Sequence, residues 1–455
     1  NIDIVVILLF FFFFIWWALK NRKYENASEY FLAGKSQNWF VVGSSLFAAS
    51  VSSSTLMGHS GEGFISGIAV FNYNVGAIFV IIFVSLFFLP FYIKSGIYTI
   101  PEYLGRRFDN RSRKYFSFIT IIGNVFLDAG AALYTGALIL KIIFPEIDMM
   151  WIIIGMALMA GTYTIIGGLS SAINADMIQS IILIAGSVLL SIFCFNSVGG
   201  WENFVEHFHD GVWLNLIRPN SDTTVPWFSI FLSIPILGFY FWGNNQVIVQ
   251  RVMSAKTVNE GRLGFLFVAF LYVFTLFIFI APGMVGRMID LFGVGDTLPN
   301  EIIDGNTLRA QYGIDTNEVY PRLILKLLPV GLIGVMIACM VSALTSTLSA
   351  TLSSVSTLFT MDFYKSWRPE SSPRHLVRVG QWTSFIALVV AVLWAPLIGK
   401  FASLVAYYQE FSSYLAPPIV GTFLVGLFWK GSTRNGAFAG LMSGLAMSAL
   451  IMTYK

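Results

Sequence analysis

The chain of 455 residues is 56% hydrophobic and only 11% charged. That is too little charge to solvate the surface of a soluble protein of this length. Together with a mean hydropathy of +0.75, this composition indicates a polytopic membrane protein, with residues 1–455 forming a single transmembrane domain. The net charge of +3 gives no reason to expect a nucleic-acid partner.

About twelve apolar runs are long enough to cross ~30 Å of hydrocarbon. They fall at residues 3–19, 38–62, 66–93, 115–143, 148–167, 177–198, 226–249, 263–286, 321–361, 379–398, 402–429 and 435–453. The first run has basic residues behind it and none ahead of it, the reverse of a cleavable signal peptide. We therefore expect it to be a true first span.

The basic residues predict the orientation of the chain. They cluster in alternate loops, at residues 20–35, 94–114, 251–262, 365–378 and 430–434. Loops rich in Lys and Arg stay on the cytoplasmic side of a membrane. We therefore expect a multi-pass protein of the cytoplasmic membrane with its N-terminus outside, and the acid-rich segment 287–317 falls outside by the same count.

The sequence lacks the motifs of an enzyme. Cys194 and Cys339 lie in apolar runs, and the four histidines show no zinc-binding spacing. No phosphate-binding glycine motif or nucleophile with a matching base stands out either. We therefore expect the protein not to be an enzyme.

Residues 346–354 carry a hydroxyl at six of nine positions within an apolar run. Polar groups buried in a bilayer need partners, and neutral oxygens beside unwound backbone coordinate a dehydrated Na⁺. The segment therefore indicates an ion pathway. The alternative is that these small residues only permit close helix packing.

Two apolar runs are interrupted. The first interruption joins the polar stretch 48–55 to a glycine-rich stretch, and the second covers residues 235–246, five spans later. Broken helices at matching positions are typical of an inverted repeat with its binding site at the midplane. This predicts a first repeat over residues 38–198 and a second over residues 226–429. For each glycine cluster alone, close helix packing is the alternative.

Asp128 lies in the middle of the fourth predicted span. A carboxylate there is costly, and usually faces a cavity, an ion or a partner charge. The alternative is a protonated or locally paired structural side chain. Asp176 opens the sixth span, where it either binds an ion or only complements the helix dipole. Tyr73 and the aromatic residues 240–242 are either core side chains or a stacking floor for a ring-shaped solute.

Eight short motifs now give the chain a resemblance to the sodium:solute symporter family, most closely to its sodium/sugar branch. They are YFLAGK (30–35), GIYTIPEYL (96–104), GGLS (167–170), DMIQ (176–179), QVIVQR (246–251), PGM (282–284), FTMDFY (359–364) and LFW (427–429). They run in order over nearly the whole chain. The resemblance implies an all-α membrane protein with a five-plus-five inverted-repeat core of the LeuT type, an extra N-terminal helix and at least one C-terminal helix.

The same resemblance implies where sodium binds. The main site would use the backbone carbonyls of Ala48, Val51 and Ala343 and the hydroxyls of Ser346 and Thr347. A second Na⁺ site, present in some members, would map to Asp176, Ser346 and Ser349. Its fourth position is Ala350, where the family has a hydroxyl.

The solute site departs further from the family pattern. Sugar-contacting positions map to Thr55, Asn74, Ala77, Asp128, Gly238, Tyr272 and Gln409, and only Gln409 keeps the family residue. The aromatic gate position is Phe241, where a tyrosine is usual, and Trp242 beside it is retained. The galactose hydrogen-bond pattern is therefore not carried over.

The hydroxyls of Ser50, Ser52 and Thr55 resemble the arrangement in sialic-acid symporters of the family, but the carboxylate-binding arginine of those proteins maps to Asp128. A solute carboxylate ~5 Å from Asp128, at an effective dielectric constant of ~20, costs roughly 3 kcal/mol. This argues against an acidic solute unless Asp128 is protonated.

We therefore expect a Na⁺-coupled symporter that imports a small neutral polyhydroxylated solute, a monosaccharide or polyol, by alternating access. The alternative solutes are an amino acid, an amine or a sialic-acid-like compound. A solute-gated sensor or channel on the same scaffold is a rival of a different class.

Overall fold

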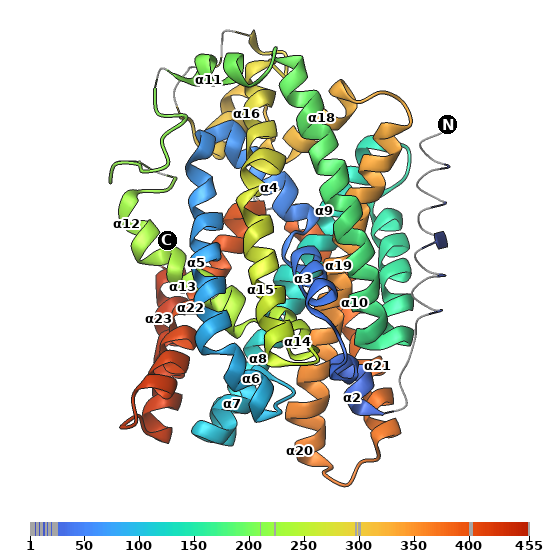
Figure 1. Cartoon of the computed structure of the whole chain (residues 1–455), viewed down its shortest axis with the longest axis vertical. Helices are drawn as coiled ribbons and strands as arrows, with labels where there is room; N and C mark the ends of the chain where they lie inside the picture. The colour runs from blue at the N-terminus through green and yellow to red at the C-terminus, as the bar shows by residue number, and fades with distance from the viewer. Residues whose placement is uncertain are drawn as a thin grey trace.

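The computed structural model of the chain is a bundle of helices (Figure 1). It describes residues 26–209, 211–222, 224–295, 298, 302–399 and 404–453, together with six positions among the first 25. The predicted first span over residues 3–19 therefore lies largely outside the described residues. The described part forms no strand and contains only two isolated bridges, Gln37 to Ala255 and Arg218 to Pro226.

The helices of the N-terminal half are α2 (Ala27–Leu32), η1 (Ala33–Lys35), α3 (Trp39–Ser50), α4 (Ser53–Ser66), η2 (Gly67–Val70), α5 (Phe71–Phe87), α6 (Leu89–Ser95), α7 (Ile100–Arg107), α8 (Asn110–Ile122), η3 (Gly123–Ala129), α9 (Gly130–Ile143), α10 (Met149–Ser197) and α11 (Trp201–His209).

The second half contains α12 (Trp227–Phe231), α13 (Ser233–Phe239), η4 (Tyr240–Asn244), α14 (Gln246–Met253), α15 (Val258–Val273), η5 (Leu276–Ile280), α16 (Ala281–Met288), α17 (Gly305–Tyr312), η7 (Thr316–Glu318), α18 (Val319–Leu327), α19 (Leu332–Leu358), η8 (Phe359–Tyr364), α20 (Lys365–Trp367), α21 (Pro373–Ile398), α22 (Leu404–Phe428) and α23 (Arg434–Thr453).

By length and composition, seven helices of the described chain suffice to cross a membrane, or eight if the pair Val258–Val273 and Leu276–Met288, bent by 44°, is one span. The sequence predicted about twelve runs. Part of the difference arises because α10 is counted once although its backbone is not helical at Gly168 (φ 66°, ψ −168°), and the two helices that meet there correspond to the predicted runs 148–167 and 177–198. Another part arises because α3 ends early, which leaves an apolar helix too short to count.

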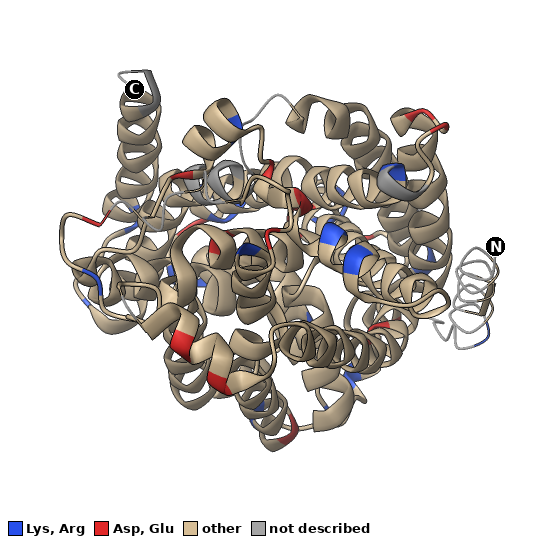
Figure 2. Cartoon of the chain, turned by 90° about the horizontal axis from the view of Figure 1, so that it is seen from above, with Lys and Arg blue, Asp and Glu red and all other residues tan. Residues whose placement is uncertain are grey.

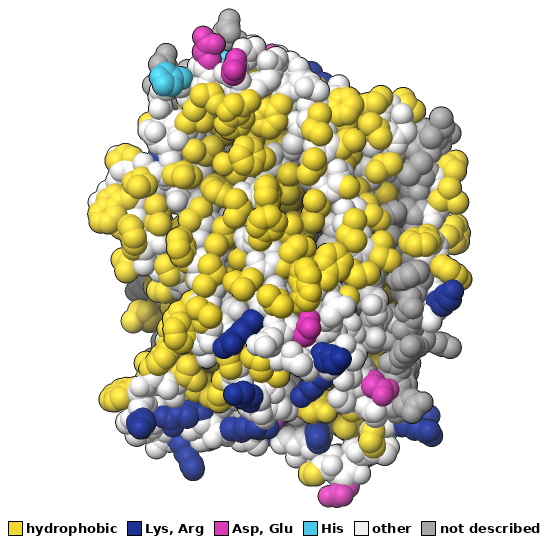
Figure 3. Space-filling view, in the orientation of Figure 1, with side chains coloured by type: hydrophobic (Ala, Val, Ile, Leu, Met, Phe, Trp, Pro, Cys, Tyr) yellow, Lys and Arg dark blue, Asp and Glu magenta, His cyan; other side chains and the backbone are white. Residues whose placement is uncertain are grey.

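The surface has the pattern expected of a membrane protein. Hydrophobic side chains form a broad band across the molecule, and Lys and Arg gather toward one end of it (Figure 3). Seen from above, charged residues occupy little of the ribbon (Figure 2). The predicted orientation depends on this uneven distribution of basic residues, because the basic end is expected to face the cytoplasm.

The hydroxyl-rich helix α19 lies inside the bundle. Its side chains from Met336 to Leu358 are all buried, and it packs against α3, α9, α10 and α21. Its hydroxyls therefore face other helices and not lipid, which is where polar groups of a membrane helix find partners.

Both predicted helix interruptions are present. Between α3 and α4, Val51 is non-helical (φ −103°, ψ 85°). The Ser52 Oγ accepts a hydrogen bond from the Thr55 amide at 3.1 Å, and the Thr55 Oγ1 accepts one from the Ser52 amide at 3.3 Å. The second break follows η4 at Asn245, whose side chain accepts a hydrogen bond from the Val247 amide at 2.8 Å. Side chains thus satisfy backbone groups that unwinding exposes. The bounds of the two repeats, 38–198 and 226–429, stay a prediction.

Helices α4 and α16 cross at glycines. A methyl group on Gly283 would run into the backbone carbonyl of Ser60, and one on Gly63 would run into that of Ile280. Neither obstacle is a flexible side chain, so the two helices would have to separate. The glycines of the first interrupted run therefore serve helix packing here.

We predict that Gly283→Ala lowers the free energy of unfolding by about 1–3 kcal/mol, the usual cost of overpacking a tight contact. Thermal unfolding of the purified protein in detergent measures the effect. Gly155→Ala is the matched control, because the space around Gly155 on α10 is open. Equal melting temperatures for Gly283→Ala and the wild type would contradict the role assigned to this crossing.

Candidate functional site

A cavity of about 270 Å³ lies where the two broken helices meet. Its walls come from the break between α3 and α4, from the faces of α4 and α5, from η3 and η4, and from α15 and α22. This volume suits a solute of monosaccharide size, since it lies just below the range for drug-sized ligands.

Nine of the ten predicted solute residues line this one cavity. They are Ser50, Ser52, Thr55, Tyr73, Asn74, Asp128, Phe241, Trp242 and Tyr272. The tenth, Gln409, lies on α22, but its side chain is outside the described residues. Ala77 and Gly238, which map to sugar-contacting positions of the family, also line the cavity. The structure therefore brings together residues separated by up to 222 positions in sequence.

Several of the predicted polar groups already have partners. Thr55 caps α4 together with Ser52. The amide group of Asn74 is held at both ends, by the His59 ring at 3.2 Å and by the Thr275 hydroxyl at 2.8 Å. Ser50 donates to the Phe47 carbonyl at 3.0 Å and is hydrogen-bonded to the Tyr272 hydroxyl. These groups shape the wall of the cavity, and no pattern in the sequence indicates these hydrogen bonds.

The aromatic wall has one buried ring and one that faces the cavity more openly. Trp242 is 2% exposed and makes edge contacts with Tyr272 and Phe241, with ring centroids 5.4 Å apart in both pairs. Phe241 is only partly buried. Both rings belong to η4, a π-helical turn, and such turns often occur at functional sites. Phe241 is therefore the ring better placed to lie against a solute.

Asp128 belongs to a second π-helical segment, η3, and lines the cavity. Its carboxylate is hydrogen-bonded to the Tyr408 hydroxyl of α22. The described lining includes no Lys or Arg. Asp128 is therefore held by a neutral partner within the cavity and has no counter-ion there.

Several polar residues of the cavity were not singled out from the sequence, among them His59, Glu62, Tyr408 and Ser412. His59 and Glu62 extend the face of α4 that begins at Thr55, and Tyr408 and Ser412 lie one helical turn apart on α22. His59 and Glu62 could have been predicted, because positions 55, 59 and 62 share one face of a helix. That prediction requires knowing that a new helix starts at residue 53.

The predicted main sodium site lies at the edge of the same cavity. Val51 and Thr347 line it, while Ala48, Ala343 and Ser346 are buried next to them in the chain or one helical turn away. The Thr347 hydroxyl donates to the Ala343 carbonyl at 3.1 Å, and the Ser346 hydroxyl donates to Asp176 at 2.6 Å. Both hydroxyl protons are thus used within the protein, which leaves oxygen lone pairs as the groups available to a cation.

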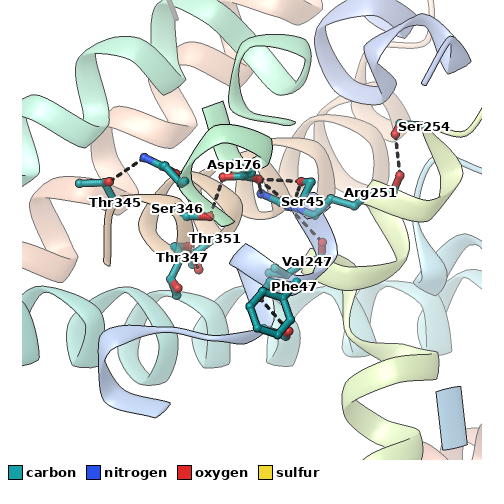
Figure 4. Close-up of polar contacts among 12 residues, drawn as sticks. Ser45, Phe47, Asp176, Val247, Arg251, Ser254, Thr345, Ser346, Thr347 and Thr351 are labelled. Atoms are coloured by element: carbon teal, nitrogen blue, oxygen red, sulfur yellow. Dashed lines mark hydrogen bonds and ion pairs between the residues drawn. The ribbon is translucent and has the colours of Figure 1, made fainter. Parts of the chain in front are cut away.

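Asp176 is the centre of a buried polar network (Figure 4). One carboxylate oxygen accepts from Ser346, and the other accepts from the Ser45 hydroxyl at 2.7 Å and from Arg251 Nη2 at 2.8 Å. Asp176 and Arg251 are both fully buried. Ser349, the third residue of the predicted second Na⁺ site, is also fully buried on α19. The negative charge at this position is therefore already balanced by a guanidinium group.

The sequence of the chain is similar to those of several known transporters. The chain is 34% identical over 450 residues to solute carrier family 5 member 4A of Mus musculus, with 93% of this chain and 68% of that protein covered. It is 34% identical over 444 residues to sodium/myo-inositol cotransporter 2 of Mus musculus, covering 93% of this chain and 65% of the relative. It is 32% identical over 447 residues to a sodium/glucose cotransporter of Vibrio parahaemolyticus, covering 95% and 80%. The chain thus spans about two thirds of the length of these mammalian relatives.

The fold is shared with a solved structure, that of a Na⁺-coupled sialic acid symporter in a substrate-bound outward-open state. The TM-score is 0.83 at 22% identity, with 99% of this chain and 98% of that chain covered. This likeness confirms the predicted all-α membrane fold. The pattern described as the sodium:solute symporter family matches residues 30–444, so the chain belongs to the sodium:solute symporter family.

Proposed function

We propose that the protein is a Na⁺-coupled symporter that imports a small neutral polyhydroxylated solute, a monosaccharide or polyol, by alternating access. The observation that carries the proposal is the shared cavity, where Val51 and Thr347 of the sodium position and nine predicted solute residues meet at the broken helices. Relatives named for glucose and myo-inositol support the solute class.

A single sodium ion provides enough energy for concentrative uptake. Moving one charge down ~100 mV releases about 2.3 kcal/mol. A tenfold sodium gradient adds about 1.4 kcal/mol. The sum corresponds to several hundredfold accumulation of the solute. Transport against a gradient separates this function from that of a sensor or channel on the same scaffold.

The charge of the cavity lining disfavours an acidic solute such as sialate. Asp128 and Glu62 are both in the lining, which contains no Lys or Arg in the described part of the chain. A carboxylate brought into such a site has no charge partner. Among the alternatives, a zwitterionic or cationic amine is the one that Asp128 favours, because its carboxylate would serve as the counter-ion.

A second sodium position, on Asp176, Ser346 and Ser349, would have to accommodate Arg251. Any cation there competes with the guanidinium group for the same carboxylate.

We also propose that the protein lies in the cytoplasmic membrane with its N-terminus outside, since basic loops mark the cytoplasmic side.

Replacing Ser346 or Thr347 with Ala should raise the Na⁺ concentration for half-maximal uptake several-fold, because an oxygen ligand of a dehydrated cation is lost. The measurement is Na⁺-driven uptake into proteoliposomes across a series of Na⁺ concentrations. Ser356→Ala is the control, since it removes a hydroxyl from the same buried helix away from the cavity. Unchanged Na⁺ dependence in both site variants would falsify the assignment.

Asp176→Asn should lower the stability of the protein by about 3–5 kcal/mol, because it leaves the buried Arg251 without a counter-charge. Thermal unfolding in detergent detects this loss. The control is Glu318→Gln, which breaks an ion pair with Arg322 whose side chains are 28% and 46% exposed and should cost at most about 1 kcal/mol. Similar losses in the two variants would contradict a structural role for the Asp176–Arg251 pair.

Asp128→Asn separates the two solute classes. With a neutral solute, an amide still accepts a hydroxyl proton, so the variant should retain partial transport with an altered order of preference among sugars. With a cationic solute the counter-charge disappears and transport should collapse. Uptake of each solute by wild type and variant is the measurement, and a variant that handles every solute as wild type does would rule out a role for Asp128.

A further inference from the structure

Glu62 gives the solute cavity a second carboxylate beside that of Asp128. It lies on α4 two turns beyond Thr55 and on the same face, with His59 between them. Its carboxylate accepts no hydrogen bond and forms no ion pair with any residue that the structure describes. It is therefore a strong hydrogen-bond acceptor aimed at the space where the solute would bind.

The bound sodium does not compensate this charge. The predicted sodium ligand Val51 lies in the break before α4, and Glu62 lies nine residues beyond the first residue of that helix, Ser53, or about 14 Å along its axis. Asp128 differs from Glu62, because Tyr408 already donates a hydrogen bond to it. Of the two cavity carboxylates, Glu62 is the one without a partner.

Neighbouring cationic side chains are also engaged elsewhere. Arg287 of the adjacent helix α16 stacks on the Trp213 ring, with its guanidinium carbon 4.5 Å from the ring centroid, and donates to the Phe64 carbonyl at 3.4 Å. No Lys or Arg lines the cavity within the described chain. When both carboxyl groups are ionised, one sodium ion leaves the filled cavity one positive charge short of neutrality.

We propose that this cavity also takes hydroxylated solutes that carry one ammonium group, such as amino sugars, and binds them more tightly than their neutral parents, with Glu62 as the counter-ion of the ammonium group. The inference rests on the proposed function, because it takes this cavity to be the solute site. An ammonium group is close in size to the hydroxyl it replaces. The difference in affinity between an amino sugar and its neutral parent therefore reports the effect of the charge and not of the fit.

The test is inhibition of Na⁺-driven uptake of labelled D-glucose in proteoliposomes by D-glucose, D-glucosamine and N-acetyl-D-glucosamine, repeated with the galactose and mannose series. In the wild type we expect the amino sugar of the accepted series to inhibit about tenfold more strongly than its parent, which is a ratio equivalent to about 1.4 kcal/mol. The N-acetyl derivative has no charge and should show no such gain.

The decisive readout is the ratio of the two inhibition constants in Glu62→Gln, which should fall close to one. Glu62→Asp should keep part of the preference, because it keeps the charge. Glu206→Gln is the matched control: it makes the same chemical change on the exposed face of α11, away from the cavity, and should keep the wild-type ratio. The ratio corrects for variants that fold less well, because both constants come from one preparation.

Equal inhibition by parent and amino sugar in the wild type, or a preference that survives in Glu62→Gln, would overturn the inference. Equilibrium binding to the purified protein, followed by thermal shift with and without Na⁺, separates this failure from that of the proposed function. If amino sugars bind in a Glu62-dependent way without Na⁺-driven uptake, the inference stands and the symport proposal fails. If no amino sugar of any series binds, the inference fails.

Discussion

The fold depends on one constraint: backbone groups exposed by a helix break inside the hydrocarbon have no water to bond with. The chain meets this constraint with its own short side chains. Ser52 and Thr55 cap the restart of α4, and Asn245 caps the restart of α14. Because the breaks are stabilised in this way, they bring loose carbonyl groups and a polar helix start to the middle of the bundle. The cavity and the sodium position both lie at these breaks.

The bundle contains buried carboxylates in two different arrangements, one paired with a cation and the other without a cationic partner. Asp176 is paired with Arg251 and two serine hydroxyls, so it forms a closed polar cluster between α3, α10, α14 and α19. Asp128 and Glu62 instead face the cavity without a cationic partner in the described lining. A satisfied cluster fixes helices relative to one another. Carboxylates without a cationic partner are suited to bind a solute reversibly.

The sequence predicted the family through its ordered motifs and the all-α fold through its apolar runs. It also predicted the two helix breaks, because runs of Gly, Ser and Asn are weak helix formers. Part of the cavity lining was also anticipated, mostly through positions that the family resemblance singled out. The two runs predicted within α10 match its two halves, which meet at Gly168, where the backbone is not helical. The role of each candidate residue in binding stays a prediction.

The remaining features of the site depend on three-dimensional information. The Asp176–Arg251 pair joins residues 75 positions apart, and no local pattern indicates it. Glu62 and His59 face the cavity only because α4 restarts at residue 53, which resets the rotational phase of the helix. The π-helical turns around Asp128 and Phe241 change which side chains point inward, and short propensity patterns do not encode them.

The hydroxyls of α19 have a consequence for movement within the bundle. Thr347, Thr351 and Thr357 each donate to the carbonyl four residues earlier in the same helix. Their protons are therefore satisfied without help from a neighbouring helix, and adjacent helices meet a surface of small groups and oxygen lone pairs. Neighbouring helices use such lone pairs: Asn124 of η3 donates to Ser354 at 2.7 Å, Gln179 of α10 to Thr345 at 3.1 Å and Gln250 of α14 to Thr357 at 2.8 Å. A helix that shifts along α19 would therefore have to break these bonds and remake them with hydroxyls at a new register.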